Sequence, residues 1–339
     1  MKSVCIILLL VVTVACTDQK EARLQQFLIK GNAEVSRKNY DQATYYFNEA
    51  LRLEPCFADA LNNLGTIYFK QEQFEKALSQ YDKAIACRPE YLDTYYNRAN
   101  TQYELKAYFS ALKDIEKIAS VKPDTSVVYF LQSLIYTKLR DFEAAAASLQ
   151  RAIDLDGANA DYLTNRAIIK YYAKDYAGAR GDLELARKEN ADEPNIDNTE
   201  AMIAIEEGRL SEAMDFANAA LARLPSEPYF LNNRGYILLL QNKLHEAEVD
   251  INRSLELNPY NGWAYRNKGI FYLLTGDFPN AVRVLSQALE MDPYIEKIHF
   301  YLGMAHWKNG DKVTACRHFH LSEEAGDAML TADLIKMCS

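Results

Sequence analysis

The chain has 339 residues, of which 49% are hydrophobic, and its formal net charge is -9. No basic run interrupts this acidic composition, so DNA, RNA and the surface of an anionic membrane are not favoured partners. The length would suit two ordinary domains, unless the chain is built from repeats, which extend in one dimension. We expect no nucleic-acid partner.

The pattern of the first 15 residues is typical of an export signal. Lys2 provides a positive charge, and residues 4–15 form an apolar run that is shorter than the roughly 20 residues needed to span a bilayer. The run ends in Thr-Val-Ala-Cys, which resembles the lipobox of bacterial lipoproteins, although threonine stands where leucine is usual. The resemblance implies a signal peptide over 1–15, a lipid on Cys16 and a polar tether over 16–23. The alternative is an ordinary signal peptide that is cut at the same place.

From Leu24 to Met329 the chain divides into nine consecutive repeats of 34 residues, with no insertion or deletion. We number the residues of each repeat as positions 1–34. Position 8 is always glycine, alanine or serine, position 17 is bulky and apolar in eight repeats, and position 32 is proline in six. Position 20 is alanine in every repeat: Ala43, Ala77, Ala111, Ala145, Ala179, Ala213, Ala247, Ala281 and Ala315.

Helical periodicity accounts for this pattern. In the second repeat, residues 58–91, apolar side chains recur on one face of 61–68 and again on one face of 74–84, with a polar turn between them. The small positions let two short helices approach closely, and proline ends the second helix. Such a pair is too small to bury its apolar faces alone, so it needs neighbouring copies.

Small residues at positions 8 and 20, bulky ones at 4, 17 and 24, and proline at 32 resemble the tetratricopeptide repeat. The resemblance implies an all-α fold, a right-handed superhelical solenoid of nine helix pairs over 24–329, with the first helices lining a concave face. A capping helix is expected over 330–339. Its apolar face would consist of Met329, Leu330, Leu334 and Ile335.

Two repeats depart from the pattern. Gly157 replaces proline in the fourth repeat, and in the sixth repeat Asp197 and Ala217 stand where apolar and bulky residues are usual. We expect the weakest packing in the sixth repeat, with a bend or local opening there.

Four cysteines remain once the signal is removed and the lipobox cysteine is lipidated, an even number that suits an oxidising compartment. Cys316 and Cys338 lie ten residues before and twelve residues after the glycine that breaks the last long helix, so a disulfide between them would clamp the capping helix. Cys56 and Cys87 lie at the ends of successive second helices and form a second candidate pair. The alternative for each cysteine is a small buried hydrophobe.

The sequence shows no catalytic motif of the G-x-S-x-G, Walker, H-E-x-x-H or dinucleotide-glycine types. The repeats occupy the chain from Leu24 to the cap and leave no room for a catalytic domain. His299 and His306 share one side of a helix, whereas His318 and His320 lie on different sides, so we expect packing rather than a metal site. We therefore expect no enzyme activity, no cofactor and no metal.

In tetratricopeptide repeats a ligand lies along the concave face, lined by first-helix positions such as 2, 5, 6, 9, 12 and 13. In the early repeats these residues are mostly amides and hydroxyls, and in the later ones they are mostly aromatic or apolar. Amides can bond an extended peptide backbone, and aromatic pockets can hold its side chains. The alternative is that a tightly wound superhelix buries part of this face against itself. The candidate groove residues are Asn32, Asn63, Asn97, Tyr172, Tyr236, Trp263, Asn267, Tyr301 and Trp307.

The carboxylate clamp of chaperone-binding members of the family is matched only at its two asparagine positions, by Asn32 and Asn63. Leu28, Asp93 and Asn97 occupy the places where the clamp has cationic side chains. We therefore expect no binding to an acidic chaperone tail.

These observations predict a non-enzymatic scaffold of the bacterial cell envelope that binds a protein or peptide segment along its concave groove. Only a lipid would attach it to a membrane. We expect secretion across the inner membrane and anchoring in the outer membrane, on its periplasmic or surface face, because Thr17 is not the acidic residue that retains some lipoproteins in the inner membrane. The alternative is a lipoprotein that binds a glycan or small ligand, with Trp263 and Trp307 as stacking platforms.

Overall fold

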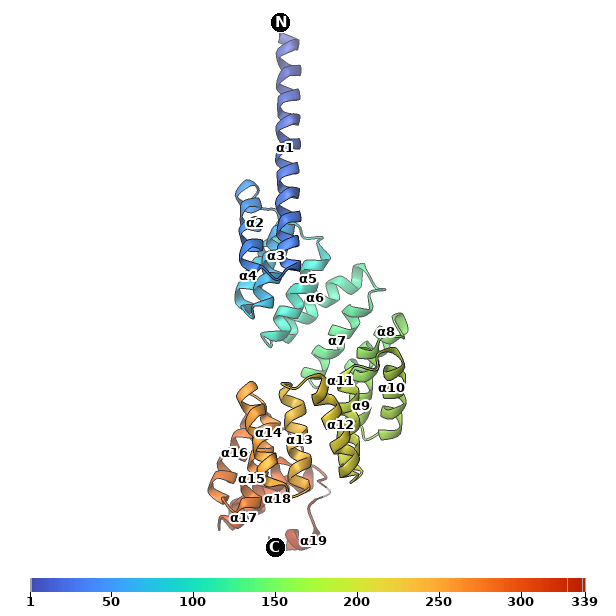
Figure 1. The fold of residues 1–339 in the computed structure, drawn as a ribbon, viewed down its shortest axis with the longest axis vertical. Helices are drawn as coiled ribbons and strands as arrows, with labels where there is room; N and C mark the ends of the chain where they lie inside the picture. The colour runs from blue at the N-terminus through green and yellow to red at the C-terminus, as the bar shows by residue number, and fades with distance from the viewer. Residues whose placement is uncertain (1, 328, 337, 339) are drawn as a thin grey trace. The chain divides into compact units, whose positions relative to one another are not determined.

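The computed structural model describes residues 2–327, 329–336 and 338, with side chains from residue 19 onward apart from those of 332 and 333. Within these residues the regular structure consists of nineteen α-helices, and none of it is strand. Figure 1 shows these helices following one another along the chain. The all-α class expected from the sequence is confirmed.

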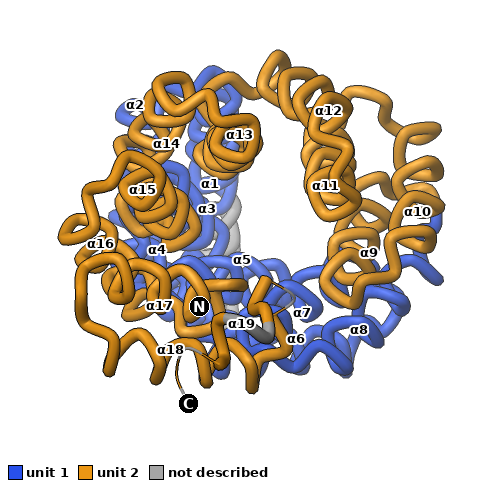
Figure 2. The backbone as a smooth tube through the Cα atoms, turned by 90° about the horizontal axis from the view of Figure 1, so that it is seen from below, with its two compact units in different colours: residues 1–157 blue, residues 158–339 orange. Residues whose placement is uncertain are grey.

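The chain divides into two compact units, Met1–Gly157 and Ala158–Ser339, which Figure 2 colours separately. We call them unit 1 and unit 2. Unit 1 holds the helices of repeats one to four, and unit 2 holds those of repeats five to nine and the C-terminal segment. The boundary follows the glycine that replaces proline at position 32 of repeat four.

Each repeat contributes one odd-numbered and one even-numbered helix, and α19 follows the last pair. The helices of unit 1 are α1 (Lys2–Ser36), α2 (Tyr40–Leu53), α3 (Ala58–Lys70), α4 (Phe74–Cys87), α5 (Leu92–Glu104), α6 (Tyr108–Val121), α7 (Ser126–Lys138) and α8 (Phe142–Leu155). The helices of unit 2 are α9 (Ala160–Tyr172), α10 (Tyr176–Glu189), α11 (Pro194–Glu206), α12 (Leu210–Arg223), α13 (Pro228–Leu240), α14 (Leu244–Leu257), α15 (Gly262–Thr275), α16 (Phe278–Met291), α17 (Ile298–Lys308), α18 (Lys312–Glu324) and α19 (Ala332–Lys336).

The helices pack in consecutive pairs. Each odd-numbered helix contacts mainly the even-numbered helix that follows it, which gives nine pairs among the described residues, from α1 with α2 to α17 with α18. The second helix of every pair begins at position 17. The nine helix pairs expected from the sequence are therefore confirmed.

Small residues at positions 8 and 20 let the two helices of a repeat approach closely, as expected. All nine alanines at position 20 are 0% exposed. A Cβ atom added to Gly31 would lie 2.3 Å from the ring of Phe47, and one added to Gly303 would lie 2.5 Å from the ring of Phe319. The bulky residue at position 24 thus packs on bare backbone, and a larger residue at position 8 would force it aside.

The turn inside each repeat contains a left-handed residue at position 15, which the sequence did not predict. The φ angle at this position is positive in all nine repeats, with glycine in three and asparagine in one. This left-handed conformation costs a residue with a Cβ atom roughly 1 kcal/mol of free energy. The packing of the two flanking helices must therefore stabilise the turn. The five other residues are Lys38, Glu72, Lys106, Arg140 and Lys174, with φ between 59° and 62°.

Buried ion pairs join the two helices of repeats three, five and seven, a second feature that the sequence did not predict. In each case an arginine at position 7 makes two hydrogen bonds, of 2.6–2.8 Å, to an aspartate at position 23. Burial alone would raise the pKa of Asp182, but hydrogen bonds from Arg166 and Lys170 lower it below its usual range. The pairs are Arg98–Asp114, Arg166–Asp182 and Arg234–Asp250.

Repeat six contacts the preceding repeat less than other repeats of its unit do, since α11 meets α10 less extensively than α13 meets α12, in line with the expected weak junction. Within the repeat, however, the two unusual residues are well packed. Asp197 is 3% exposed and forms ion pairs with Arg187, at 2.9 Å, and with Arg223. The carboxylate at the apolar position is therefore neutralised by arginines of α10 and α12. Ala217 is buried in a core cluster with Ile237, so the small side chain permits close packing rather than leaving a gap.

Helix α1 continues through the segment expected to be a polar tether. No glycine or proline precedes Gly31, so nothing ends the helix there. Lys20 forms an ion pair with Glu54 at 2.5 Å, and Leu24 is 3% exposed, which makes this segment part of the first helix pair. The side chains of the expected signal peptide and of Cys16 lie outside the described residues. Among the helices that are described, none is both long and apolar enough to cross a membrane.

Both cysteine pairs considered in the sequence are joined as disulfides in the structure. Cys56, which precedes α3, is bonded to Cys87 at the end of α4, and Cys316 of α18 is bonded to Cys338, which follows α19. The two Cα atoms lie 5.4 Å apart in each pair, and the sequence separations are 31 and 22 residues. Closing loops of this length stabilises a fold by about 3–4 kcal/mol in the chain-entropy account.

Replacing Asp114 with alanine should destabilise unit 1 by about 3 kcal/mol, because the guanidinium of Arg98 would lose its buried carboxylate. Arg98 also pairs with Asp82, whose side chain is 55% exposed. The substitution Asp82→Ala is therefore a matched control and should cost less than about 1 kcal/mol. Urea unfolding followed by circular dichroism measures both effects, and equal costs would contradict a stabilising role for the buried pair.

Candidate functional site

We call the residues at positions 2, 5, 6, 9, 12 and 13 of the first helices the inner surface of each unit. In unit 1 this surface carries a ladder of asparagine side chains. Asn97 Nδ2 donates to Asn62 Oδ1 at 3.0 Å, and Asn62 Nδ2 donates to Asn63 Oδ1 at 3.3 Å. Asn63 Nδ2 then donates to Asn32 Oδ1 at 2.8 Å. The ladder joins repeats one to three and includes three of the candidate groove residues.

Contacts between consecutive first helices put these amides within hydrogen-bonding distance. Helices α1, α3 and α5 contact one another in order, so position 6 of one repeat lies beside position 5 or 9 of the previous repeat. Each primary amide has two N–H donors and two acceptor lone pairs, and a ladder bond uses one donor. Asn32 is exposed, and Asn63 and Asn97 are half-buried. Their remaining hydrogen-bonding groups can therefore meet a ligand.

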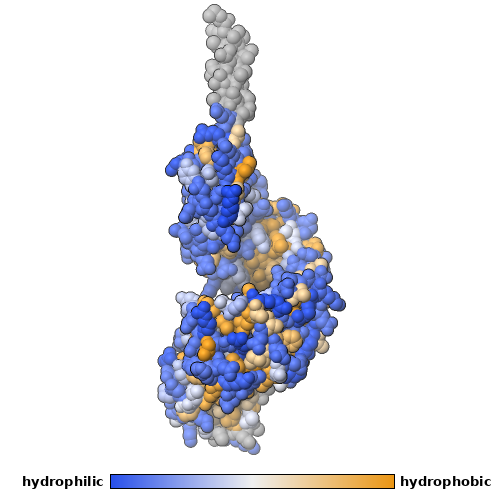
Figure 3. Space-filling view, viewed as in Figure 1, coloured by the Kyte–Doolittle hydropathy of each residue, from blue (hydrophilic) through white to orange (hydrophobic). Residues whose placement is uncertain are grey.

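Aromatic residues flank the ladder on the same surface. The ring of Phe69 lies edge-to-face with that of Phe74, with centroids 5.5 Å apart, and Tyr103 and Tyr108 are arranged similarly at 5.8 Å. These rings are half-buried. Figure 3 shows hydrophobic residues gathered in small groups on a mainly hydrophilic visible face. The inner surface of unit 1 thus carries both amide groups and partly exposed rings.

Unit 2 repeats the asparagine ladder and covers one end of it, at Asn267, while Asn233 is half-buried like Asn63 and Asn97. Asn233 Nδ2 donates to Asn198 Oδ1 at 2.9 Å, and Asn267 Nδ2 donates to Asn232 Oδ1 at 2.8 Å. Asn267 is 0% exposed, and its Oδ1 accepts hydrogen bonds of 2.9 and 3.1 Å from the guanidinium of Arg266. The prediction that Asn267 lines an open groove is therefore wrong, because Arg266 occupies its free side.

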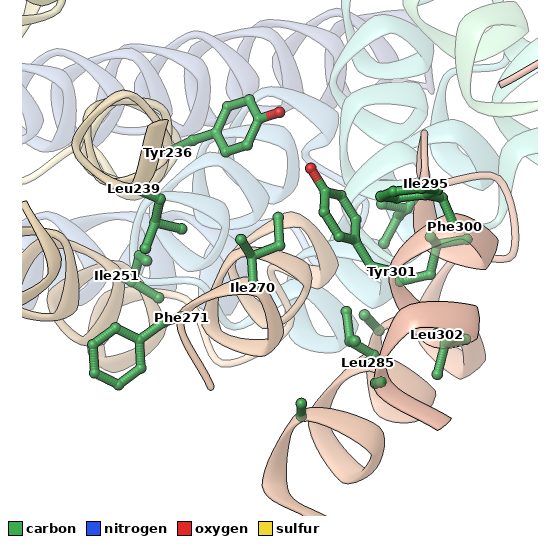
Figure 4. Close-up of a cluster of buried hydrophobic side chains, with 14 of the residues drawn as sticks. Tyr236, Leu239, Ile251, Ile270, Phe271, Leu285, Ile295, Phe300, Tyr301 and Leu302 are labelled. Atoms are coloured by element: carbon green, nitrogen blue, oxygen red, sulfur yellow. The ribbon is translucent and has the colours of Figure 1, made fainter. Parts of the chain in front are cut away.

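Tyr236 and Tyr301 also belong to the core of unit 2 rather than to an open groove. They are 9% and 6% exposed, and Figure 4 shows their hydroxyl ends turned toward each other. The guanidinium of Arg266 lies 4.8 Å from the centres of both the Tyr236 and the Trp263 rings. Burial, with a further contribution from the Tyr236 hydroxyl, raises the pKa of Tyr301 well above its usual range.

An ion pair spans the inner surface of unit 2. Lys297 Nζ, just before α17, lies 3.3 Å from Glu206 Oε1 at the end of α11, although the two residues are 91 positions apart. Repeats six and nine therefore meet, which is the self-burial that the sequence left open as an alternative. Tyr172 remains 48% exposed, and Trp263 and Trp307 are half-buried, so these three candidate residues stay partly accessible.

Three histidines of repeat nine come together, which the sequence did not predict. His318 Nδ1 lies 3.0 Å from His299 Nδ1, and the rings of His318 and His306 have centroids 5.6 Å apart. His306 Nδ1 lies 3.5 Å from Asp311 Oδ2. The seven-residue spacing of the first two histidines was a usable signal, but the position of the third depends on how α18 packs on α17. Within the described part of the chain, no group of three or more His, Cys, Asp or Glu residues is arranged to hold a metal ion.

Family models identify the repeats. Models described as tetratricopeptide repeat match residues 58–91, 127–159, 198–262 and 268–319, and a model described as TPR repeat matches residues 31–72. The chain is therefore a tetratricopeptide-repeat protein, as its sequence pattern indicates. This fold is generally a non-catalytic scaffold for contacts between proteins.

Solved structures share the fold at low sequence identity, and no curated protein matches the chain. A chain of the APC/C hetero-tetramer Cut9-Hcn1 has a TM-score of 0.65 at 16% identity, and the match covers 88% of this chain and 58% of that one. The human IFIT1 dimer with PPP-AAAA gives 0.61 at 17% identity, with 92% and 81% covered. Pseudomonas aeruginosa pilF gives 0.55 at 18%, with 62% and 96% covered. At such identities the likeness shows the fold alone.

The histidine cluster predicts a pH dependence of stability in repeat nine. Burial, followed by the charges of His299, His306 and Arg317, lowers the pKa of His318 to about 4, and burial lowers that of His299 against a weaker opposing effect of Asp327. The unfolded imidazole titrates near 6.5, roughly, so the unfolded state binds more protons between about pH 4 and pH 6.5. Stability should therefore be fully present above about pH 6.5 and fall as the pH drops toward about 4.

Hydrogen exchange of α17 and α18, with an NMR titration of the imidazoles, measures this dependence. In His318→Gln the loss of protection between about pH 6.5 and pH 4 should become smaller, because one depressed group is gone. Protection factors that do not change over this pH interval in the native chain would contradict the prediction.

Proposed function

We propose that this chain is a non-enzymatic scaffold of the bacterial cell envelope that binds an extended segment of a partner protein on the inner surface of unit 1. The observation that carries the proposal is the accessible asparagine ladder. Asn32 is exposed and Asn63 and Asn97 are half-buried, whereas Asn267 in the equivalent ladder of unit 2 is covered.

The ladder suits an extended backbone. Such a backbone presents N–H and C=O groups in alternation, and a primary amide can serve as donor or acceptor to either. The bonds within the ladder hold the amides in place, which reduces the side-chain entropy lost when a ligand binds. Phe69 and Tyr103 offer partly exposed rings to apolar side chains of the same segment.

An acidic tail does not suit this surface. Leu28 and Asp93 stand where the carboxylate clamp has cationic side chains, and the amide of Asn97 already donates to Asn62. We expect a neutral, partly apolar segment rather than the acidic tail of a chaperone.

Two features support a location in the envelope. The N-terminal apolar run followed by Cys16 resembles the export signal of bacterial lipoproteins. Two disulfides join Cys56 to Cys87 and Cys316 to Cys338, and such bonds persist mainly in oxidising compartments. We infer that the chain crosses the inner membrane and is held at the outer membrane by a lipid on Cys16, on its periplasmic or surface face.

A lipoprotein that binds a glycan or another small ligand is the second candidate. Trp307 favours it, because its ring is half-buried and partly accessible beside Lys312 Nζ, at 5.2 Å. Trp263 weighs against it, since the guanidinium of Arg266 lies over that ring. Glycan-array binding that is lost in Trp307→Ala would favour this second function.

Replacing both Asn63 and Asn97 with alanine should weaken partner binding at least about tenfold, because each lost amide hydrogen bond contributes about 1 kcal/mol. The control is Asn48→Ala, an exposed asparagine on the second helix α2, which should bind as the native chain does. Crosslinking from intact cells identifies the partner, and titration of the purified partner measures affinity. Undiminished affinity of the double variant would overturn the assignment of the surface.

The anchor is tested separately with Cys16→Ala. Metabolic labelling with palmitate should mark the native chain but not this variant, which should leave the membrane fraction. Capture of the partner should be equal for both forms, because the lipid determines location and not recognition. A native chain that takes up no label would contradict the lipoprotein assignment while leaving the binding surface untouched.

A further inference from the structure

The C-terminal segment, residues 326–338, leaves the repeat pattern at the end of α18. Gly326 has a φ of +70°, a left-handed conformation that turns the chain out of the helix. The turn is closed by Asp327 Oδ2, which accepts a hydrogen bond of 2.9 Å from Ser322 Oγ. We call residues 326–338 the tail.

The tail packs against the inner surface of repeat nine. Tyr301, at position 6 of that repeat, is 6% exposed, and its hydroxyl lies 3.7 Å from Met329 Sδ. Leu330 and Leu334 pack against the core cluster that contains Tyr301 and Phe300. The sequence predicted a cap beside the helix of Cys316, and α19 does contact α18. The contact of Met329 with Tyr301 also places an apolar residue of the tail on the surface where a ligand of this fold would bind.

The tail has little structure of its own to hold it there. Its helix α19 has only 5 residues, far below the roughly 12–15 at which an isolated helix becomes stable in water. Met329 is still 38% exposed. The disulfide between Cys316 and Cys338 closes the tail into a loop, which converts binding into an intramolecular event at an effective concentration of the order of millimolar. The tail thus resembles a weakly bound peptide ligand that a disulfide tethers to its binding site.

We propose that the inner surface of repeat nine is a docking site for a short apolar segment, and that the chain's own tail occupies this site. The proposal deepens the proposed function, on which it rests only for the idea that inner surfaces bind peptides. It removes the inner surface of repeat nine from the surfaces open to an external partner, because the chain's own tail fills it. It also implies that the tail can be displaced by a peptide of the same sequence.

The experiment uses the full chain in three forms. The first is the native chain. The second carries Cys316→Ser and Cys338→Ser, which unties the tail and keeps its contacts. The third adds Leu330→Asp and Leu334→Asp, which place charges on the apolar face of the tail. The probe is a fluorescent peptide with the sequence of residues 326–336, and its anisotropy reports binding.

The third form should bind the peptide at least about tenfold more tightly than the native chain, because its own tail no longer competes. The second form should lie between them. A peptide that itself carries the two leucine-to-aspartate changes is the matched control and should bind none of the forms. Equal binding of the peptide to the native and third forms, or equal binding of the two peptides to the third form, would overturn the proposal.

Hydrogen exchange gives an independent measurement that does not depend on the folding of the third form. In the second form, amides of 329–336 should exchange at least about tenfold faster than in the native chain, while those of unit 1 stay unchanged. Unchanged exchange in the tail would show that the disulfide does not hold it in place. None of these readouts involves the external partner, so they succeed or fail independently of the function proposed for unit 1.

Discussion

Packing of a bulky side chain at position 24 on the small residue at position 8 limits how closely the two helices of a repeat approach, in every repeat except the sixth, where position 24 is Ala217. Phe47 lies on Gly31 in repeat one and Phe319 lies on Gly303 in repeat nine, with no space for a Cβ atom at either glycine. Within each unit, consecutive first helices contact one another. The asparagine ladder depends on these contacts, since Asn97 can reach Asn62 only if α3 and α5 are correctly spaced.

The same scaffold produces two different inner surfaces, because the residues at a few positions differ. In unit 1, Asn62 stands at position 5 and the ladder stays partly open to solvent. In repeat eight of unit 2, position 5 is Arg266, whose guanidinium bonds to Asn267 and lies over Tyr236. A long, planar cation thus stands at the position where unit 1 has a short amide that is buried within its ladder. Self-recognition in unit 2 and recognition of a partner in unit 1 use the same positions.

Structural features that recur in every repeat could be predicted from the sequence. Contacts between residues at different positions of the repeat, or between distant repeats, could not. Nine alanines at position 20 were enough to predict nine helix pairs. The pairing of Arg98 with Asp114 was not evident, because only three of the nine repeats have it. Burial of Tyr301 and the contact of Glu206 with Lys297 depend on how far the superhelix of unit 2 winds, which no local pattern records. The candidate asparagines of unit 1 were found from residue type and helix position alone.

The two units differ in net charge as well as in their inner surfaces. Residues 158–339 contain 27 acidic and 19 basic side chains, whereas residues 1–157 contain 20 and 19, so nearly all of the net negative charge belongs to unit 2. A surface that binds an extended backbone through neutral amides does not need a strong electrostatic field. Such a field would favour ligands of one charge over ligands of the opposite charge. The negative charge of unit 2, whose inner surface is partly covered by its own residues, can instead oppose self-association through charge repulsion. The nearly neutral charge of unit 1 is therefore consistent with recognition of a neutral peptide segment. The negative charge of unit 2 is consistent with an inner surface that is partly covered by the unit's own residues.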